Sequence, residues 1–307
     1  LHIQQVRVPI GVFAIIYESR PNVTVDIACL CLKSSNVCVL KGGKEAIHSN
    51  RILVQIINEA IQDVLPTHTV TLIETKKREE TLDLIQAHDY VDVIIPRGSA
   101  GLIQYVVKNA TVPVIETGAG ICHLYVDQDA SLDMALEIAK NAKIQRPSVC
   151  NAIETILVHQ KVAQEFLPKL QEIFKNVQIY GDEKTRKIID CLEAAEKSYA
   201  TEYDDYICNI KVVDDIEEAI EHIYNYSTKH SESIITGNKE TAKYFMESLD
   251  SACVYHNAST RFSDGGQFGF GAEVGISTQK LHARGPLGLQ EITSTKYMIY
   301  GNGQVRS

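Results

Sequence analysis

The chain has 307 residues, which indicates roughly two domains, and its 45% hydrophobic and 22% charged residues are typical of a soluble globular protein that buries large cores. The formal net charge of -9 and the lack of a long basic run argue against nucleic acid or an anionic membrane surface as a partner. No apolar run approaches the roughly 20 residues that a membrane helix needs, so we also expect no membrane span.

Short apolar runs alternate with helical patterns over the first part of the chain. Strands that alternate with helices of this length predict a parallel sheet with right-handed crossovers. The predicted strands are 1–8, 12–17, 37–40, 70–73, 91–95 and 112–115, and the predicted helices are 23–32, 52–64, 78–87 and 99–109.

Gly118 and Gly120 interrupt this pattern, and we place a domain boundary there. A second α/β series follows, with strands at 124–126, 155–158, 177–180, 209–213, 233–236 and 252–256 and helices at 131–142, 161–174, 183–198, 215–225 and 239–249. Residues 260–289 are glycine-rich with little periodicity, and a loop of that length is usually functional. Residues 295–300 form a last predicted strand.

Cys150 follows a predicted helix and precedes a predicted strand, in the stretch Gln145-Arg146-Pro147-Ser148-Val149-Cys150-Asn151. A thiolate is a strong nucleophile, and nearby positive charge such as that of Arg146 lowers the pKa of its thiol. The alternative is that Cys150 is an inert, buried member of the eight cysteines. We expect these cysteines to be reduced thiols of a cytosol-like compartment, and their spacing predicts no metal site.

Four other segments carry candidate functional groups. Lys41, Gly42 and Lys44 follow a strand where NAD enzymes often have an acidic residue, which favours NADP, and surface charge is the alternative. Gly98 and Ser99 lie at the start of a predicted helix, whose backbone N–H groups favour binding of a phosphate. The equally weighted alternative is an ordinary turn in which Ser99 is only the N-cap of that helix. The other candidates are Asn22 as an oxyanion donor or turn residue, Glu116 as a general base or solvated carboxylate, and Arg261 with its hydroxyl neighbours as an anion clamp.

The chain resembles the aldehyde dehydrogenase superfamily and, more closely, its γ-glutamyl phosphate reductase (glutamate-5-semialdehyde dehydrogenase) family. The resemblance covers essentially the whole chain. The motifs that carry it are Val8-Pro9-Ile10-Gly11-Val12, Tyr17-Glu18-Ser19-Arg20-Pro21-Asn22-Val23-Thr24-Val25-Asp26, Leu40-Lys41-Gly42-Gly43-Lys44-Glu45, Ile95-Pro96-Arg97-Gly98-Ser99, the Cys150 stretch, Asn257-Ala258-Ser259-Thr260-Arg261-Phe262, Gly269-Phe270-Gly271-Ala272-Glu273 and Ser277-Thr278-Gln279-Lys280-Leu281-His282-Ala283-Arg284-Gly285-Pro286.

The resemblance implies a role for each candidate residue. Cys150 is the nucleophile, and Asn22 with the Cys150 backbone N–H stabilises the oxyanion. The implied cofactor-site residues are Lys41, Gly42, Lys44, Gly98, Ser99, Glu116 and Glu202. Lys41 would contact the cofactor ribose, Ser99 the pyrophosphate and Glu202 the nicotinamide ribose. Glu116 matches the general base that activates water in dehydrogenases. The substrate-binding candidates are Arg146, Asn151, Arg261, Gly265 and Gly266.

The resemblance also implies an architecture. It comprises a Rossmann-type cofactor domain at 1–118, an α/β catalytic domain at 119–291, and a small β oligomerisation flap from residues 1–10 and about 292–307. The chain begins without methionine and lacks the largely helical segment that family members carry before Val8-Pro9, which bears on whether the cofactor domain is complete and active. A fused glutamate kinase domain is not visible either.

The implied activity is NADPH-dependent reduction of γ-glutamyl phosphate to glutamate-5-semialdehyde through a Cys150 thioester, with phosphate release, as the second step of proline biosynthesis from glutamate. The alternatives are an oxidative, non-phosphorylating aldehyde dehydrogenase and a catalytically silent member of the fold. We expect a cytoplasmic homo-oligomer, a dimer or higher, with glutamate 5-kinase as a candidate partner.

Overall fold

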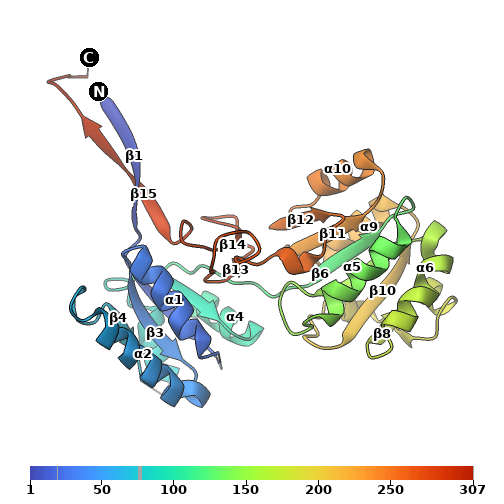
Figure 1. Cartoon of the computed structure of the whole chain (residues 1–307), viewed down its shortest axis with the longest axis horizontal. Helices are drawn as coiled ribbons and strands as arrows, with labels where there is room; N and C mark the ends of the chain where they lie inside the picture. The colour runs from blue at the N-terminus through green and yellow to red at the C-terminus, as the bar shows by residue number, and fades with distance from the viewer. Residues whose placement is uncertain (19, 75–77, 307) are drawn as a thin grey trace. The chain divides into compact units, whose positions relative to one another are not determined.

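A computed structural model describes residues 1–18, 20–74 and 78–306, and the chain forms two compact units (Figure 1). Unit 1 comprises Leu1–Thr117 and Gly265–Ser307, and unit 2 comprises Gly118–Asp264. Residues 265–291, which we predicted to belong with the catalytic domain, therefore lie in unit 1. The reason is burial, since Val274 and Leu287 from this segment pack into the same core as the strands of unit 1.

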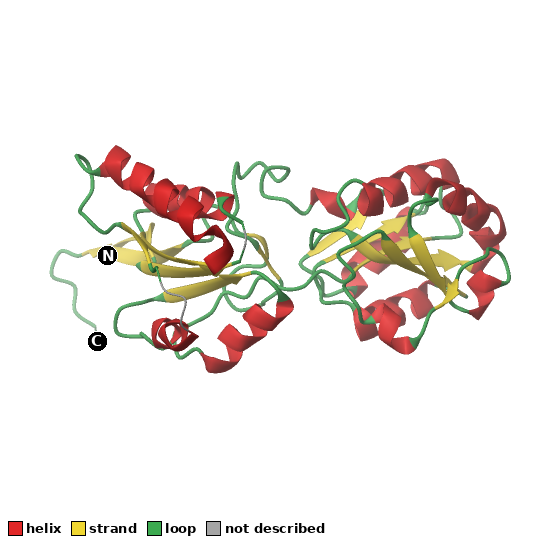
Figure 2. Cartoon of the chain, turned by 90° about the horizontal axis from the view of Figure 1, so that it is seen from below, coloured by secondary structure: helices red, strands yellow, loops and turns green. Residues whose placement is uncertain are grey.

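Unit 1 is built on a parallel sheet with the strand order β4-β3-β2-β5. Helices cover both faces of this sheet (Figure 2), because each face contributes its own apolar core. The strands are β2 (Val12–Tyr17), β3 (Val37–Gly42), β4 (Val70–Leu72) and β5 (Val93–Arg97). The helices are α1 (Asn22–Lys33), α2 (Ile47–Ile61), α3 (Arg78–Ile85) and α4 (Ala100–Asn109), with a 3₁₀ turn η1 (Lys44–Ala46).

The prediction of a strand at residues 112–115 is wrong. Only one isolated parallel bridge forms there, between Val114 and Ile94. Pro113 has no backbone N–H to donate, so a continuous ladder is disfavoured at this point.

The two ends of the chain pair with each other in unit 1. Strand β1 (His2–Pro9) runs antiparallel to β15 (Thr293–Tyr300), with His2 opposite Tyr300 and Pro9 opposite Thr293. Most residues of this ribbon are exposed. A second small antiparallel pair, β13 (Ile276–Ser277) with β14 (Gly285–Pro286), lies in the glycine-rich segment that was predicted to be a loop.

Unit 2 contains a seven-stranded parallel sheet in the order β12-β11-β6-β7-β10-β8-β9. Helices α5 and α6 cover one face, while α9 and α10 pack on the other (Figure 2). The strands are β6 (Cys122–Val126), β7 (Ile153–His159), β8 (Gln178–Gly181), β9 (Leu192–Glu193), β10 (Ile207–Val213), β11 (Ser231–Ile235) and β12 (Cys253–His256). The longer helices are α5 (Leu132–Ile144), α6 (Gln160–Ile173), α9 (Ile216–Tyr226) and α10 (Lys239–Ser248), and a 3₁₀ turn η2 (Thr260–Phe262) follows β12.

The single helix predicted at residues 183–198 is wrong. Two short helices, α7 (Glu183–Arg186) and α8 (Glu196–Tyr199), flank the short strand β9, which pairs with β8 and forms the edge of the sheet. Ile189 between them is buried in the unit 2 core. Pairing with the sheet edge and burial of Ile189 override the local helical pattern, as tertiary contacts often do.

Among the described residues, no helix combines the length and the hydropathy that crossing a lipid bilayer requires.

Candidate active site

Cys150 lies in the turn between α5 and β7 of unit 2 and is half-buried. The turn follows directly from the sequence, because Pro147 stops α5 and the buried residues of β7 begin at Ile153. Cys150 is only half-buried in this turn, so part of the residue's surface is exposed. This is the geometry that a cysteine nucleophile needs.

Asn151 forms hydrogen bonds that connect the Cys150 turn to the segment that contains Arg261. The Asn151 side chain is buried, and its Nδ2 donates to the Ser263 carbonyl at 2.8 Å while its Oδ1 accepts a hydrogen bond from Arg261 Nη1. Thr260 Oγ1 in turn donates to the Asn151 carbonyl at 2.7 Å. Asn151 is therefore an architectural residue that holds Arg261 next to the candidate nucleophile.

Arg261 is half-buried, and Gln145 fixes a second edge of its guanidinium through a hydrogen bond from Nε at 3.1 Å. Burial lowers the pKa of Arg261, while Asp264 and Cys150 act in the opposite direction. The arginine thus offers an oriented cation beside Cys150, suited to an anionic group of a substrate. Arg146, our first candidate for that charge, is exposed.

Gly265 and Gly266 begin the second segment of unit 1. The Gly265 N–H donates to Glu273 Oε2 at 2.8 Å, and the Gly265 carbonyl accepts from the Phe270 N–H at 2.8 Å. These contacts shape a tight turn within unit 1, and a part for the two glycines in substrate binding stays a prediction.

The Cys150 backbone is held from its other side by the start of β6. Cys122 Sγ donates to the Cys150 carbonyl oxygen at 3.2 Å. Gly120 lies so close that an added Cβ would come within 1.5 Å of the same oxygen. The Gly120 N–H donates to Glu202 Oε1 at 2.7 Å, so the Glu202 carboxylate, predicted to bind cofactor, already has a partner in unit 2. Burial raises the pKa of Glu202, and the hydrogen bond from Gly120 opposes that shift.

A buried ion pair connects the two elements on either side of the Cys150 turn. Lys143 in α5 and Glu154 in β7 are each no more than 1% exposed, and Lys143 Nζ lies 2.7 Å from Glu154 Oε2. Burial raises the pKa of Glu154 to about 8, although Lys143 opposes the shift. The pair links the element before the turn to the element after it.

In unit 1, the candidate cofactor residues gather at the carboxyl ends of β3 and β5. Lys41 is half-buried, and burial lowers its pKa while Glu45 and Glu80 oppose the shift. Lys44 starts η1 and is exposed. Gly42 packs against the buried Asn50 side chain, where an added Cβ would lie 2.1 Å from Asn50 Nδ2. The end of β3 therefore combines a positive charge with a buried glycine that lets the Asn50 side chain pack against the backbone.

Ser99 caps the N-terminus of α4, where its Oγ accepts from the Leu102 N–H. The Ser99 N–H also donates to Glu18 Oε2 at 2.8 Å, and an added Cβ on Gly98 would contact the same carboxylate. An anionic group thus lies at the place where we predicted a phosphate. The contact fits the electrostatics of a helix N-terminus.

Asn22 opens α1 and is exposed, and its Nδ2 donates to Asp26 Oδ2 on the same helix at 3.2 Å. Glu116 is half-buried, and its backbone N–H donates to Gln279 Oε1 at 3.0 Å. Both residues belong to unit 1. Their predicted roles stay predictions, and Ser19 of the Asn22 motif lies outside the described residues.

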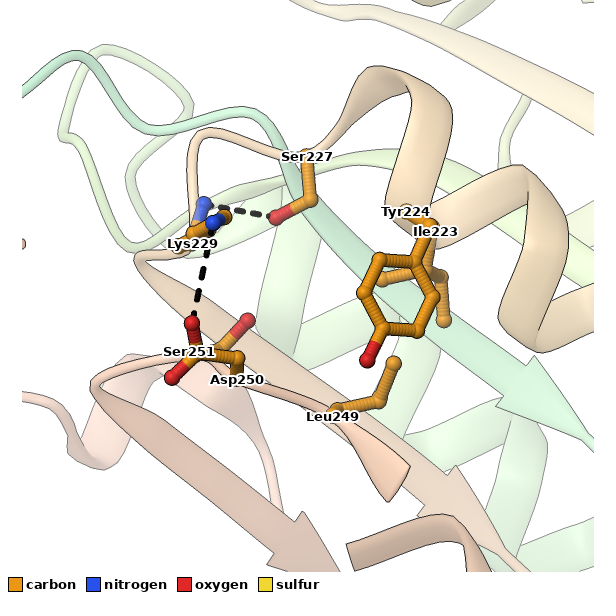
Figure 3. Close-up of a pocket in the computed structure, with 7 residues that line it drawn as sticks. All are labelled: Ile223, Tyr224, Ser227, Lys229, Leu249, Asp250 and Ser251. Atoms are coloured by element: carbon orange, nitrogen blue, oxygen red, sulfur yellow. Dashed lines mark hydrogen bonds and ion pairs between the residues drawn. The ribbon is translucent and has the colours of Figure 1, made fainter.

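Elsewhere in unit 2, a small hollow lies between the end of α9 and the start of β12 (Figure 3). Its volume of about 10 Å³ is the least that a single water occupies, so it offers no room for a substrate. Lys229 on its rim forms an ion pair with Asp250 at 3.6 Å. In the part of the chain that the structure describes, no three His, Cys, Asp or Glu side chains are arranged to hold a metal ion.

Our reading of the sequence missed Lys143, Glu154 and Gly120 as site residues. A signal was present for the first two, because each is a charged residue inside an apolar pattern that the structure buries. Gly120 was interpreted only as a domain boundary. Its close approach to Cys150 joins residues 30 positions apart, which no local pattern reveals.

Three comparisons with known proteins bear on this site. The sequence profile of the Aldehyde dehydrogenase family matches residues 2–197. The γ-glutamyl phosphate reductase of Enterococcus faecalis is 57% identical over 311 residues, covering 100% of this chain and 75% of the relative. That of Petrotoga mobilis is 58% identical over 309 residues, with 100% and 74% covered.

The solved structures agree with the sequence comparison. The crystal structure of γ-glutamyl phosphate reductase from Thermotoga maritima superposes with a TM-score of 0.97 at 52% identity, covering 99% of this chain and 75% of that one. An acetylating aldehyde dehydrogenase from Geobacillus thermoglucosidasius shares the fold, with a TM-score of 0.78 at 16% identity and coverage of 99% and 78%.

Proposed function

The chain belongs to the γ-glutamyl phosphate reductases of the aldehyde dehydrogenase family, and on this basis we propose that it reduces γ-glutamyl phosphate to glutamate-5-semialdehyde with NADPH and releases phosphate. The reaction is the second step of proline biosynthesis from glutamate. The observation that carries the proposal is the 57% identity to a reductase of that name, in a match that covers 100% of this chain.

Cys150 is the nucleophile of the proposed reaction. Its thiolate attacks the acyl carbon of γ-glutamyl phosphate, a C–S bond forms, and the C–O bond to phosphate breaks with its electron pair leaving on phosphate. The Asn22 amide and the Cys150 backbone N–H stabilise the oxyanion that develops on the acyl oxygen. After reduction of the resulting thioester, Cys150 leaves as a thiolate and the aldehyde is released. The half-buried position of the sulfur in its turn supports this role.

Arg261 and Arg146 hold the anionic groups of the substrate, with Asn151, Gly265 and Gly266 shaping the site around them. The support for Arg261 is its double fixation by Gln145 and Asn151, which orients the guanidinium before a substrate arrives. A cation that is already oriented loses little side-chain entropy on binding an anion.

The residues at the ends of β3 and β5 fit a nicotinamide cofactor, and members of this family use one. Lys41 and Lys44 provide positive charge for a ribose 2′-phosphate, which favours NADP, and Gly42 between them is part of the same candidate site. The Ser99 N–H suits the pyrophosphate, since it already binds the carboxylate of Glu18. The bound cofactor supplies the hydride that reduces the thioester.

An oxidative aldehyde dehydrogenase is the competing function. It uses a glutamate base, for which Glu116 is the candidate, to activate water at the acyl-enzyme. Reduction consumes no water, so Glu116 has no hydrolytic task in the proposed reaction. In the proposed reaction Glu116 is instead a residue of the cofactor site in unit 1.

The decisive experiment is oxidation of glutamate-5-semialdehyde by NADP with and without phosphate. The proposed enzyme needs phosphate or arsenate to release the Cys150 thioester, so NADPH formation should depend on either anion. Oxidation that proceeds equally fast without them identifies the hydrolytic dehydrogenase. No oxidation under any of these conditions identifies a catalytically silent member of the fold.

The proposed setting is the cytoplasm, where γ-glutamyl phosphate is made by a glutamate 5-kinase that is a candidate partner. None of the eight cysteines, all of which lie in the described residues, forms a disulfide, which suits a reducing compartment. We also propose a homo-oligomer, for which the exposed β1–β15 ribbon is the candidate contact.

A further inference from the structure

The Cys150 peptide rests on a three-residue segment, Gly120 to Cys122, that enters β6. Cys122 Sγ donates to the Cys150 carbonyl at 3.2 Å, and Gly120 packs against the same oxygen so closely that no side chain fits. Gly120 and Cys122 are both buried, so this contact excludes solvent. Movement of the segment must therefore move the Cys150 backbone.

Two side chains fix this segment through its backbone N–H groups. Glu202 Oε1 accepts from Gly120 at 2.7 Å, and Thr228 Oγ1 accepts from Ile121 at 3.0 Å. The bond to Glu202 is charge-assisted, which makes it the stronger type of hydrogen bond. It also acts on the glycine that touches Cys150.

We propose that Glu202 is a positioning residue for the nucleophile, acting through Gly120 on the Cys150 backbone whether or not cofactor is bound. This inference rests on the proposed function only in taking Cys150 as the nucleophile. If Glu202 only bound cofactor, its substitution would not change Cys150 in the cofactor-free protein. Experiments without cofactor therefore separate the positioning role of Glu202 from its cofactor-binding role.

The test is the rate at which iodoacetamide labels Cys150, followed by mass spectrometry in the full chain without cofactor. Glu202→Leu removes the acceptor at similar size, whereas Glu202→Gln keeps an acceptor oxygen and removes the charge. We expect the Leu variant to differ from wild type by about threefold or more, and the Gln variant to stay near wild type, because the lost hydrogen bond sets the position of Cys150.

The matched control is Asp204→Asn, which removes an exposed carboxylate two residues away and should label like wild type. Asparagine tolerates the positive φ of 55° that Asp204 has, so the control adds no backbone strain. Thermal unfolding of each variant checks that its fold is intact. Because labelling needs no turnover, a failure of the proposed reaction does not affect this result.

A second variant tests the same contact without touching Glu202. Gly120→Ala places a methyl group against the Cys150 carbonyl and should also change the labelling rate, while Gly101→Ala, where nothing lies within 4 Å, should not. In turnover, Glu202→Leu should lower kcat roughly tenfold to a hundredfold, and Glu202→Gln should recover most of this loss, since small misplacements of reacting groups cost that much.

Two outcomes overturn the proposal. Equal labelling rates in wild type, Glu202→Leu and Gly120→Ala mean that the segment does not control Cys150. Equal changes in Glu202→Leu and Glu202→Gln, with the pH profile of labelling displaced in both, mean that Glu202 acts through its charge and not through its hydrogen bond to Gly120.

Discussion

At the scale of single residues, two neighbours in the Cys150 turn have separate tasks. Asn151 is buried and uses its amide and its carbonyl to hold the segment Thr260 to Ser263. Cys150 is half-buried, and its carbonyl oxygen accepts a hydrogen bond from Cys122 Sγ. Substitutions at position 150 therefore report on chemistry, and substitutions at position 151 report on architecture.

Cys150→Ala should abolish turnover and leave the fold intact, because alanine has no sulfur to form the acyl-enzyme. Asn151→Ala is the contrasting variant, which should lower the free energy of unfolding by about 1–3 kcal/mol since it leaves buried polar partners unsatisfied. Steady-state rates and thermal unfolding of both variants are the measurements. Activity retained by Cys150→Ala would rule out the thioester mechanism.

Asn22→Ala should slow turnover by roughly a hundred- to a thousandfold, which corresponds to about 3–4 kcal/mol for the loss of one oxyanion donor. Cofactor affinity should change little, because the amide acts at the acyl carbon. Arsenate-dependent NADPH formation and NADPH binding, measured on both proteins, separate these effects. A rate loss explained entirely by weaker cofactor binding would remove Asn22 from the oxyanion site.

Glu154 makes stability depend on pH, because burial raises its pKa from 4.5 to about 8. Between these values the native state binds more protons than the unfolded chain, so the contribution of Glu154 to stability is present below about 4.5 and is lost as pH rises through about 8. Glu154→Gln does not titrate. The difference in unfolding free energy between wild type and this variant should therefore decrease with rising pH.

Denaturant unfolding at several pH values across that window measures this difference. Glu165→Gln is the matched control for loss of a glutamate carboxylate, because Glu165 forms an exposed ion pair with Lys169. A flat difference for Glu154→Gln would show that Lys143 keeps the pKa of Glu154 near its ordinary value.

At the scale of elements, the carboxyl ends of β2, β3 and β5 bring together the groups around the dinucleotide site that we propose. The contributions come from three different places: Lys41 at the end of β3, the N–H of Ser99 before α4, and Glu18 after β2. They meet because β2 lies between β3 and β5 in a parallel sheet, so all three strands end at one edge.

The enzyme should prefer NADPH over NADH, because lysines occupy the place where an NAD enzyme often has an acid. Lys41→Ala and Lys44→Ala should each reduce the ratio of the two kcat/KM values by about tenfold, the effect of one charge-assisted hydrogen bond. Lys108→Ala, in the last turn of α4, is the control for loss of an exposed positive charge. Equal kcat/KM values for the two cofactors in wild type would contradict this interpretation of the loop.

At the scale of the whole molecule, two units each complete their own core, and the ribbon of β1 and β15 has no core on either side. Ile3 lies directly opposite Ile299, and Tyr297 shares their face two residues along. Their exposures of 58%, 59% and 63% leave an apolar face that a two-stranded ribbon does not bury by itself.

We expect this apolar face to mediate self-association. Ile299→Lys should lower the molar mass measured by sedimentation velocity, because a buried unpaired charge disfavours the contact. Ser294→Lys adds the same charge on the opposite face of the ribbon and should leave the mass unchanged. The same mass for wild type and Ile299→Lys, or an equal decrease in both variants, would exclude this face as the contact.

The sequence by itself determined most of the local structure and supplied the candidates for the reactive groups. Apolar residues that recur every two residues indicate a strand, and those that recur about every 3.6 residues indicate a helix. Strand β2 and helix α1 accordingly begin and end within about one residue of their predicted limits. The predictions failed at 112–115, where Pro113 has no N–H to continue a ladder, and at 183–198, where pairing of β9 with β8 decided the outcome.

Only the tertiary structure decided which distant residues meet. Strand order, the assignment of residues 265–291 to unit 1, the bond from Gly120 to Glu202 and the buried pair of Lys143 with Glu154 all follow from packing between segments. Periodicity describes how one element faces its core, but it carries no information on which other element completes that core. For this physical reason, the sequence motif predicts Cys150 as the candidate nucleophile, whereas the residues that hold its backbone could not be predicted.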